Sequence, residues 1–404
     1  MKKHLTILLS TLLFFLSCEP EWYPPSPGTR TDRPHREGVD GVGYKKVLVL
    51  YLEGFNNLSD DIFENIEQLG HGFLPRKEDK LALLVYSHNT KNRGDYQTKT
   101  EPVICQAFQK NGTLTLDTLK TWPKDKPSVT AEMVRDVLTF VKKEFPSASY
   151  GLLYSSHATG WIPSDYNTSD DSALLSIGSE FGDKGSSQNR TMNVEDLAEA
   201  LPMDLEYIIF DCCLMGGIES IYPFKDKVRN IIASPTEILS YGFDYTTLTS
   251  RLLMQDTIEL EKVCDDYYTK YENGSSPYAT VAIYDCSTLK KLAFVCSSIF
   301  ENHKGNAFEI KETDIQNYNY TFQYHYDLKD IIRLMGADET ELKSLDSALS
   351  ETVIYKKATP YFINTRIDPE KFSGLSMYLP RTWRTKLNEL YKNTEWNMDT
   401  DFIN

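Results

Sequence analysis

The feature that most constrains the fold is a series of continuously apolar segments that alternate with amphipathic ones between residues 45 and 234. One amphipathic segment, LSDDIFENIEQL, places Ile62, Ile66 and Leu69 on one side of a helix. Buried strands that read as unbroken apolar runs, joined by helices, are typical of a mainly parallel sheet with both faces covered. The sequence therefore predicts an α/β fold, with strands in KKVLVLYLEG, LALLVYS, YGLLYSS, LEYIIF and RNIIAS.

Chemically reactive side chains follow two of these predicted strands. Functional groups of such sheets collect just beyond the carboxyl ends of the strands; His157 ends one strand, and Asp211, Cys212 and Cys213 end another. Because side chains alternate between the faces of a strand, Asp211 and Cys213 should share one side, and Cys212 should pack inside as a small hydrophobe. We expect Cys213 to project into the crevice, where a helix N-terminus near Gly216 would lower its thiol pKa. The alternative is that both thiols are buried core residues.

His157 is the histidine best suited to serve as a base for a cysteine. A cysteine attacks a carbonyl group only as the thiolate, so it needs a base and a group that stabilises the oxyanion. In YSSHATGW, His157 follows an apolar strand and precedes a turn of small residues. Of the other six histidines, two lie near the N-terminus. The remaining four have polar or mixed surroundings that suggest surface or capping roles: His71, His88, His303 and His325.

The segments SHATGW and DCCLMG, taken together, resemble motifs of the clostripain family of cysteine peptidases, which belongs to a clan of caspase-like folds. YLEGFNNLSDD is similar to the family's opening strand and turn, and SGLSMYLP is similar to its late strand. The resemblance thus extends from residue 44 to about residue 380. It implies a caspase-like α/β/α sandwich and the hydrolysis of peptide bonds in protein or peptide substrates.

The resemblance also implies roles for individual residues. By position, His157 matches the family's catalytic histidine and Cys213 its nucleophile, and the backbone N–H groups of Ala158 and Cys213 would form the oxyanion hole. Asp211 matches an acidic residue of the specificity pocket, which implies cleavage after Arg or Lys, and a buried carboxylate is a suitable receptor for such a cation. Ala158 is a departure, because the family usually has glycine there, and its methyl group would border the site.

A long polar segment, residues 162–192, separates His157 from the next predicted helix. Loops of this length in compact domains are usually functional or disordered, and a plain surface loop is the alternative to a functional one. Some family members mature by cutting themselves in this region, so the resemblance implies an activation loop. Its candidate cleavage points are Lys184 and Arg190.

Three further residues near the predicted crevice have two interpretations each. Glu237 and Asp244 follow the RNIIAS strand and could support the pocket, but solvated or capping roles are the commoner ones for such carboxylates. Trp161 could form a wall of the substrate cleft, although a tryptophan after a turn is more often packed inside the protein.

The N-terminus has the parts of an export signal. Lys2 and Lys3 form a positive region, and residues 5–16 form an apolar one that is too short to span a bilayer comfortably. FLSC resembles a bacterial lipobox, so residues 1–18 are interpreted as a lipoprotein signal peptide with Cys18 as the lipidated residue; an ordinary secretory signal is the alternative. We expect an exported bacterial lipoprotein that is anchored to a membrane and faces the periplasm or the cell surface.

The rest of the chain is interpreted as a tether and two structural units. Residues 19–43 are rich in proline, glycine and charge, which is typical of a flexible tether. Residues 44–285 form the predicted catalytic domain, and residues 286–404, with helical patterns and a late strand, form a C-terminal subdomain packed on it. The cysteines other than Cys18 show no regular spacing, so we expect mostly free, buried thiols. We also expect a monomer.

Charge and motifs exclude two other classes of function. A net charge of −15 would repel the phosphate backbone of a nucleic acid. The sequence has no HExxH motif or clustered metal ligands, so neither a metal site nor a metal-dependent hydrolase is predicted. The resemblance admits calcium, but the sequence has no EF-hand-like loop, and we expect no cofactor. The leading hypothesis is a cysteine endopeptidase. The alternative is a catalytically inactive surface binding lipoprotein, which Ala158 in place of glycine favours.

Overall fold

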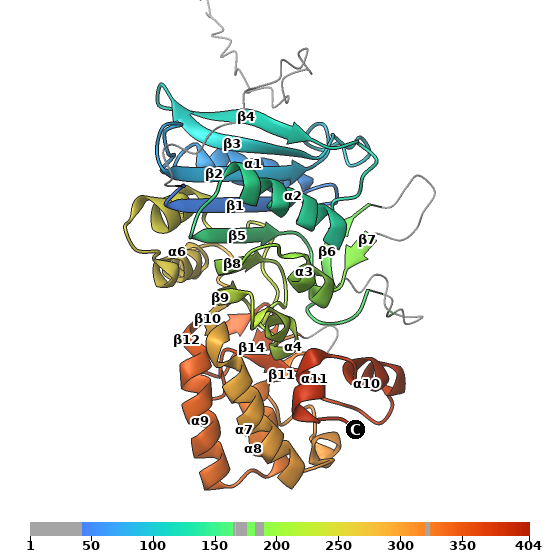
Figure 1. The fold of residues 1–404 in the computed structure, drawn as a ribbon. Helices are drawn as coiled ribbons and strands as arrows, with labels where there is room; N and C mark the ends of the chain where they lie inside the picture. The colour runs from blue at the N-terminus through green and yellow to red at the C-terminus, as the bar shows by residue number, and fades with distance from the viewer. Residues whose placement is uncertain (1–42, 165, 167–175, 182–189, 320–323) are drawn as a thin grey trace, which may run out of the picture. The chain divides into compact units, whose positions relative to one another are not determined.

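A nine-stranded sheet forms the centre of the protein, in the order β12-β10-β9-β8-β5-β1-β2-β3-β4 (Figure 1). The structure is a computed structural model that describes residues 43–164, 166, 176–181, 190–319 and 324–404. The five strands from β2 to β9 in this order run parallel, and the strands at both edges pair antiparallel. The strands span Lys46–Glu53 (β1), Leu81–His88 (β2), Val103–Lys110 (β3), Thr113–Thr121 (β4), Tyr150–Ser155 (β5), Leu205–Asp211 (β8), Val228–Ala233 (β9), Thr280–Asp285 (β10) and Val353–Ala358 (β12). This arrangement confirms the predicted, mainly parallel α/β fold.

The parallel strands are buried on both faces, as their apolar sequences require. In β1, every residue after Lys46 is buried. Val47, Val49 and Tyr51 belong to a large hydrophobic cluster that also contains the apolar side of helix α2 (Ala131–Glu144). The intervening residue Leu48 is buried as well and points to the other face, because side chains alternate along a strand. In Figure 1, α2 and α3 (Val194–Ala200) lie on one face of the sheet, and α1 (Ser59–Leu69) lies on the other.

Helix α2 illustrates how the sequence sets a helix in place. The side chain of Thr130 caps its N-terminus by accepting a hydrogen bond from the Met133 N–H, and Lys142 and Lys143 lie in its last turn, where positive charge is favourable. The remaining helices on this part of the chain are α4 (Ile218–Ile221), α5 (Tyr245–Thr249) and α6 (Leu260–Glu272).

The C-terminal part of the chain is rich in helices but also completes the sheet. Its helices are α7 (Leu289–Asn302), α8 (Leu328–Met335), α9 (Glu339–Thr352), α10 (Thr385–Tyr391) and α11 (Glu395–Thr400). Strand β12 follows α9 and pairs with β10 at one edge of the central sheet. Three small sheets pair β6 (Ile177–Glu180) with β7 (Arg190–Met192), β11 (Tyr326–Asp327) with β15 (Ser376–Met377), and β13 (Tyr361–Phe362) with β14 (Thr365–Arg366). Within the described residues, no helix combines the length and the apolar character needed to cross a bilayer.

Candidate active site

Strands β5 and β8 bring the two predicted reactive residues to neighbouring positions at the carboxyl ends of the parallel strands. The strands are parallel neighbours, and Ser155 is paired with Asp211 at their carboxyl ends. His157 comes two residues after Ser155, and Cys213 comes two residues after Asp211. Neighbouring strands lie roughly 4.8 Å apart. The histidine and the cysteine therefore follow equivalent positions on adjacent strands. The sequence predicted that each lies at the end of a strand, but not that the two strands are neighbours.

The loops that carry the two residues also touch each other. After β8 the chain turns sharply, with Leu214 in the left-handed region at φ 60°. Gly160, three residues after the histidine, has φ +77°, and a Cβ atom there would come within 2.8 Å of the Leu214 carbonyl oxygen. Only glycine fits this close approach without strain, because both the space and the positive φ exclude a side chain. The SHATGW turn is thus shaped to pack against the cysteine loop.

Cys213 is half-buried, and its thiol interacts with a third segment of the chain. The Sγ–H group donates to the Ile238 carbonyl oxygen over 3.5 Å, and the Ile238 N–H donates to Sγ over 3.4 Å. Burial raises the pKa of the thiol to about 12, and the charges of Glu237 and Asp211 raise it further. The resting thiol is therefore protonated at neutral pH. The expected lowering of this pKa by a helix N-terminus is wrong, because the following helix, α4, has only four residues and starts at Ile218.

Cys212 faces the opposite way, into the core. It belongs to the large hydrophobic cluster, and its thiol donates to the Tyr154 carbonyl oxygen over 3.2 Å. Burial raises the pKa of this thiol well above its usual value. Strand alternation thus predicted correctly that Cys212 packs in the core. The projection of Cys213 into a crevice stays a prediction. The described cysteines are all free, and all except Cys213 are buried, as expected.

His157 is held by Asn57, a residue that was not among the predicted site residues. Its Nε2 lies 2.6 Å from Oδ1 of Asn57, in the turn after β1. An amide oxygen can only accept, so Nε2 carries the proton of a neutral imidazole. Burial lowers the pKa of His157 and favours this neutral form. The neighbouring Asn56 fixes the turn by donating to the carbonyl oxygens of Glu53 and Ser179. Two adjacent asparagines at the end of a central strand were the sequence feature that could have indicated a polar contact with the histidine.

Strand β6 supports the backbone of the histidine loop. The Gly178 N–H donates to the His157 carbonyl oxygen over 2.8 Å, and the Thr159 N–H donates to the Ser176 carbonyl oxygen over 3.1 Å. Ala158, which is buried, forms a bridge with Ile177 between these two hydrogen bonds. The residue that replaces the family's usual glycine is therefore accommodated in a short antiparallel pairing.

Asp211 is enclosed by the chain that follows β9. Its Oδ2 accepts hydrogen bonds from the Tyr245 hydroxyl over 2.8 Å and from Ser155 Oγ over 3.4 Å. Burial raises its pKa to about 6, while the Tyr245 hydrogen bond and the charge of Lys270 act in the opposite direction. The carboxyl group is therefore mostly ionised at pH 7.

The three other residues considered for the predicted crevice have different roles. Asp244 caps helix α5 by accepting from the Thr246 N–H, which is the expected capping role. Glu237 is half-buried and accepts from Asn319 Nδ2 over 3.0 Å. Trp161 is buried with its ring against Tyr378 and Tyr391, so it packs inside rather than forming a wall of the cleft.

Two of the histidines expected at the surface or in caps are in fact buried. His88 lies at the end of β2 with its Nδ1 atom 2.7 Å from Ser128 Oγ. His325 packs behind the SHATGW turn, where a Cβ atom on Gly160 would come within 2.9 Å of its ring. Burial lowers the pKa of both rings, to about 3 for His88 and about 4 for His325. The polar residues next to them in the sequence predicted exposure, but both histidines are buried by residues that are distant in the sequence.

The candidate processing and lipidation residues lie mostly outside the described part of the chain. Lys184 and Cys18 are both outside the described residues. Arg190 is the first residue of β7 and is paired with Glu180 of β6, so part of the long polar segment forms a small hairpin. Among the described residues, no cluster of three histidine, cysteine or acidic side chains is arranged to hold a metal ion.

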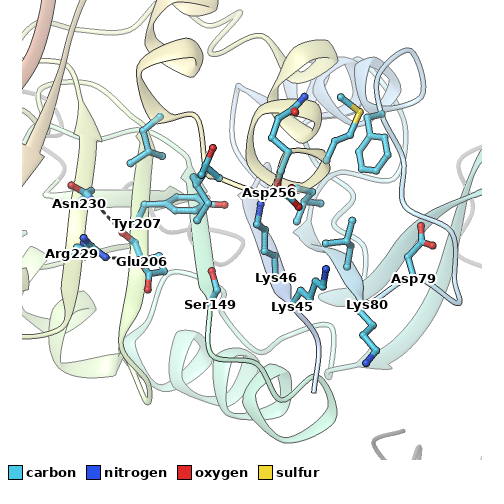
Figure 2. A pocket seen from close by; sticks show the side chains of 18 of the residues that line it. Lys45, Lys46, Asp79, Lys80, Ser149, Glu206, Tyr207, Arg229, Asn230 and Asp256 are labelled. Carbon is cyan, nitrogen blue, oxygen red and sulfur yellow. Dashed lines mark hydrogen bonds and ion pairs between the residues drawn. The ribbon is translucent and has the colours of Figure 1, made fainter. Parts of the chain in front are cut away.

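A cavity of about 1170 Å³ lies at the opposite end of the parallel strands, where they begin (Figure 2). Its lining includes residues at the amino-terminal ends of four parallel strands: Lys46 begins β1, Ser149 precedes β5, and Glu206 and Arg229 are the second residues of β8 and β9. Figure 2 shows Arg229 directed at Glu206, its ion-pair partner. This cavity is separate from His157 and Cys213, which follow the carboxyl ends of the strands.

Comparisons with known proteins agree with this architecture. The model of the clostripain family matches residues 110–366. An inactive zymogen C11 protease from Parabacteroides distasonis superposes with a TM-score of 0.74 at 28% identity, over 90% of this chain and 99% of that one. Two structures of secreted C11 cysteine proteases from Bacteroides thetaiotaomicron each have a TM-score of 0.73 and cover 89% of this chain and 99% of the other. One of them is 25% identical; the other, 21% identical, is in complex with an irreversible peptide inhibitor. No curated protein matches the chain.

Proposed function

This chain belongs to the clostripain family and is a cysteine peptidase, and on that premise we propose that Cys213 is its nucleophile and His157 its general acid and base. The observation that carries the proposal is the pairing of Ser155 with Asp211, which sets the two residues at equivalent positions beyond adjacent strands. Contact between the Gly160 turn and the Leu214 carbonyl adds support, because it packs the two loops against each other.

The proposed reaction starts from a neutral pair. Asn57 keeps the proton of His157 on Nε2, which leaves Nδ1 as the nitrogen that can take a proton. Cys213 transfers its thiol proton to His157 as Sγ attacks the scissile carbonyl carbon. The backbone N–H groups of Ala158 and Cys213 stabilise the resulting oxyanion. His157 then protonates the leaving amine, and the enzyme is left as a thioester.

The second half of the reaction regenerates the thiol. His157 removes a proton from a water molecule, which attacks the thioester carbonyl carbon. The carbon–sulfur bond breaks, the peptide acid leaves, and the proton returns from His157 to Cys213. The resting thiol and imidazole are both neutral at pH 7, so the proton moves as substrate reacts rather than beforehand.

Substrate preference is assigned to Asp211. Its carboxylate is buried two residues before the nucleophile and is mostly ionised at pH 7. A guanidinium or ammonium group that reached it would exchange solvent for a charged hydrogen-bond partner. We therefore expect cleavage after Arg or Lys.

Maturation and location complete the proposed function. The similar protein from Parabacteroides distasonis is described as an inactive zymogen. In the sequence, Lys184 lies between β6 and β7, and Arg190 is the first residue of β7. Self-cleavage at Lys184 would therefore cut the chain between β6, which pairs with the histidine loop, and β7. The similar Bacteroides proteins are described as secreted, which agrees with an export signal and with lipid attachment at Cys18. We propose a monomeric, membrane-anchored lipoprotein that acts on proteins or peptides.

Substitution of the two adjacent cysteines tests the proposed nucleophile. We expect Cys213→Ala to lower kcat on a fluorogenic Arg peptide by roughly 10⁴-fold or more, because the covalent step is lost. Cys212→Ala is the matched control, since it removes a thiol of the hydrophobic core and should keep most of the activity.

Loss of activity only in the Cys212 variant would overturn the assignment. A wild-type protein that binds peptides but turns over none of them, whether basic or neutral, would instead favour the inactive binding lipoprotein.

A further inference from the structure

Lys270, on helix α6, places its ammonium group in a cradle of backbone carbonyl oxygens. Nζ donates to the carbonyl oxygens of Tyr241, Gly242 and Phe243 over 2.7, 3.3 and 3.0 Å. An ammonium group has three N–H donors and no acceptor, so this cradle satisfies it completely. The turn at residues 241–243 is therefore built around a positive charge.

The same turn lies against Asp211. A Cβ atom on Gly242 would come within 2.4 Å of Oδ2 of Asp211, and Gly242 has φ +55°. The Tyr245 hydroxyl, from just beyond the turn, donates to that same oxygen. The carboxylate of Asp211 and the ammonium of Lys270 thus both contact Gly242, so the carboxylate has a countercharge within the protein.

Electrostatic coupling between the two groups agrees with this geometry. The charge of Lys270 lowers the pKa of Asp211, and Asp211 is the largest influence raising the pKa of Lys270 against the effect of burial. Asp244 and Glu64 also raise the pKa of Lys270. Asp211 is buried whereas Lys270 is only half-buried, so the lysine is the member of the pair nearer to solvent.

We propose that Lys270 is a specificity-determining residue that opposes the entry of a cationic substrate side chain to Asp211. This proposal rests on the proposed function, in which Asp211 receives Arg or Lys. A substrate cation that reaches Asp211 must also approach the Lys270 ammonium on the other side of Gly242, and like charges repel more strongly inside a protein than in water. Lys270 would thereby reduce the preference for basic over neutral substrates, so that only peptides with further favourable contacts are cut efficiently.

The test compares two peptides that differ only in charge. A fluorogenic peptide with Arg before the cleaved bond is paired with the same peptide carrying citrulline, which has nearly the same shape but no charge. Lys270→Gln removes the charge and keeps two N–H donors for the cradle, while Lys270→Arg keeps the charge. Lys291→Gln, at an exposed lysine of α7 paired with Glu351, is the control for the change in net charge.

We expect Lys270→Gln to raise the Arg-to-citrulline ratio of kcat/KM roughly tenfold, mainly through a lower KM for the Arg peptide. The ratio should stay within about twofold of wild type for Lys270→Arg and Lys291→Gln. The gain should shrink in 0.5 M salt, because mobile ions screen the repulsion. A purely structural role of Lys270 would lower the activity on both peptides together and leave the ratio unchanged, which would overturn the proposal.

The same measurements distinguish a failure of the role proposed for Asp211 from a failure of the role proposed for Lys270. If Asp211 receives the cation, Asp211→Asn should abolish the advantage of Arg over citrulline. A wild-type protein that prefers Arg, combined with an unchanged ratio in Lys270→Gln, would overturn the role of Lys270 alone. Equal cleavage of both peptides by wild type and by Lys270→Gln would overturn both. If Lys270→Gln melts far below wild type, Lys270→Met provides a second charge-free variant for the same ratio.

Discussion

Cys212 and Cys213 are chemically identical neighbours that directly follow β8, which ends at Asp211, and their environments differ: Cys212 packs in the core, whereas Cys213 is half-buried. The alternation of side chains was enough to predict which thiol enters the core. It could not predict the contact of Cys213 with Ile238, because that residue is 25 positions later and reaches the thiol only through the order of the strands. Burial raises the thiol pKa by more than the Ile238 hydrogen bond lowers it, so the expected direction of the shift was wrong.

The neutral resting state of Cys213 and His157 predicts how a thiol reagent reacts with the enzyme. Burial raises the pKa of Cys213 to about 12, so below that value the reactive thiolate decreases tenfold for each unit that the pH falls. We expect the rate of inactivation by iodoacetamide to rise roughly tenfold per pH unit between pH 7 and 9. A Cys212→Ala protein should show the same profile. A rate that is constant from pH 6 to 8 would indicate a preformed thiolate–imidazolium pair and would contradict this expectation.

Strand β6 shows what sequence patterns miss at the scale of an element. The segment SIGSE contains a single large apolar residue, Ile177, and lies inside a polar stretch whose composition predicts a loop. Its strand conformation comes from its pairing with β7 and from backbone hydrogen bonds with the histidine loop, while the Ser128 N–H donates to the side chain of Glu180. The hairpin β3–β4 was missed for a different reason. TLTLDTLKT alternates polar and apolar residues, which is typical of a half-buried strand, but it lacks the continuously apolar character of the predicted strands.

Gly178 is the position of β6 where a small change should affect the histidine loop most. It has φ +75°, and a Cβ atom there would come within 2.7 Å of Glu53 Oε2, the Tyr154 hydroxyl and Val129 Cγ1. Glu53 and Tyr154 are buried and hydrogen-bonded to each other, so they have little freedom to move away. We expect Gly178→Ala to displace β6 and to lower kcat/KM at least tenfold, because the Gly178 N–H supports the His157 carbonyl.

The matched control is Gly112→Ala in the turn between β3 and β4. Gly112 also has a positive φ, +80°, but a Cβ atom there would have nothing within 4 Å. It therefore carries only the backbone strain, about 1 kcal/mol, and should leave kcat/KM nearly unchanged. Equal losses of activity in the two variants would show that backbone strain, rather than the support of the histidine loop, is responsible.

The whole molecule is organised by a sheet whose strands come from distant parts of the chain. The sequence predicted the parallel centre, because buried parallel strands are continuously apolar. It did not predict that β12, more than 65 residues after β10, would pair with β10 at the edge, since such a pairing is set by packing rather than by local pattern. The proposed boundary between residues 285 and 286 therefore falls directly after a strand of the central sheet.

This topology predicts the fate of a chain cut between β6 and β7. A cut after Lys184 would place β1 and β5 on one fragment and β8 and β9 on the other, yet β5 and β8 remain paired along five residues, from Gly151 with Tyr207 to Ser155 with Asp211. Both strands are almost fully buried, so separating the fragments would expose the core to water. We expect the cut protein to run as two bands on a denaturing gel but to elute as one species of unchanged size in native buffer.

A Cys213→Ala chain with an inserted recognition site for a specific protease at residues 184–190 allows this cut without self-cleavage. The uncut form of the same chain is the control. The cut protein should also unfold at a lower denaturant concentration when it is diluted, because its unfolding releases two fragments whereas the intact chain stays one molecule. Fragments that separate in native buffer would show that the β5–β8 pairing does not hold the two halves together, and cleavage would then inactivate the enzyme rather than mature it.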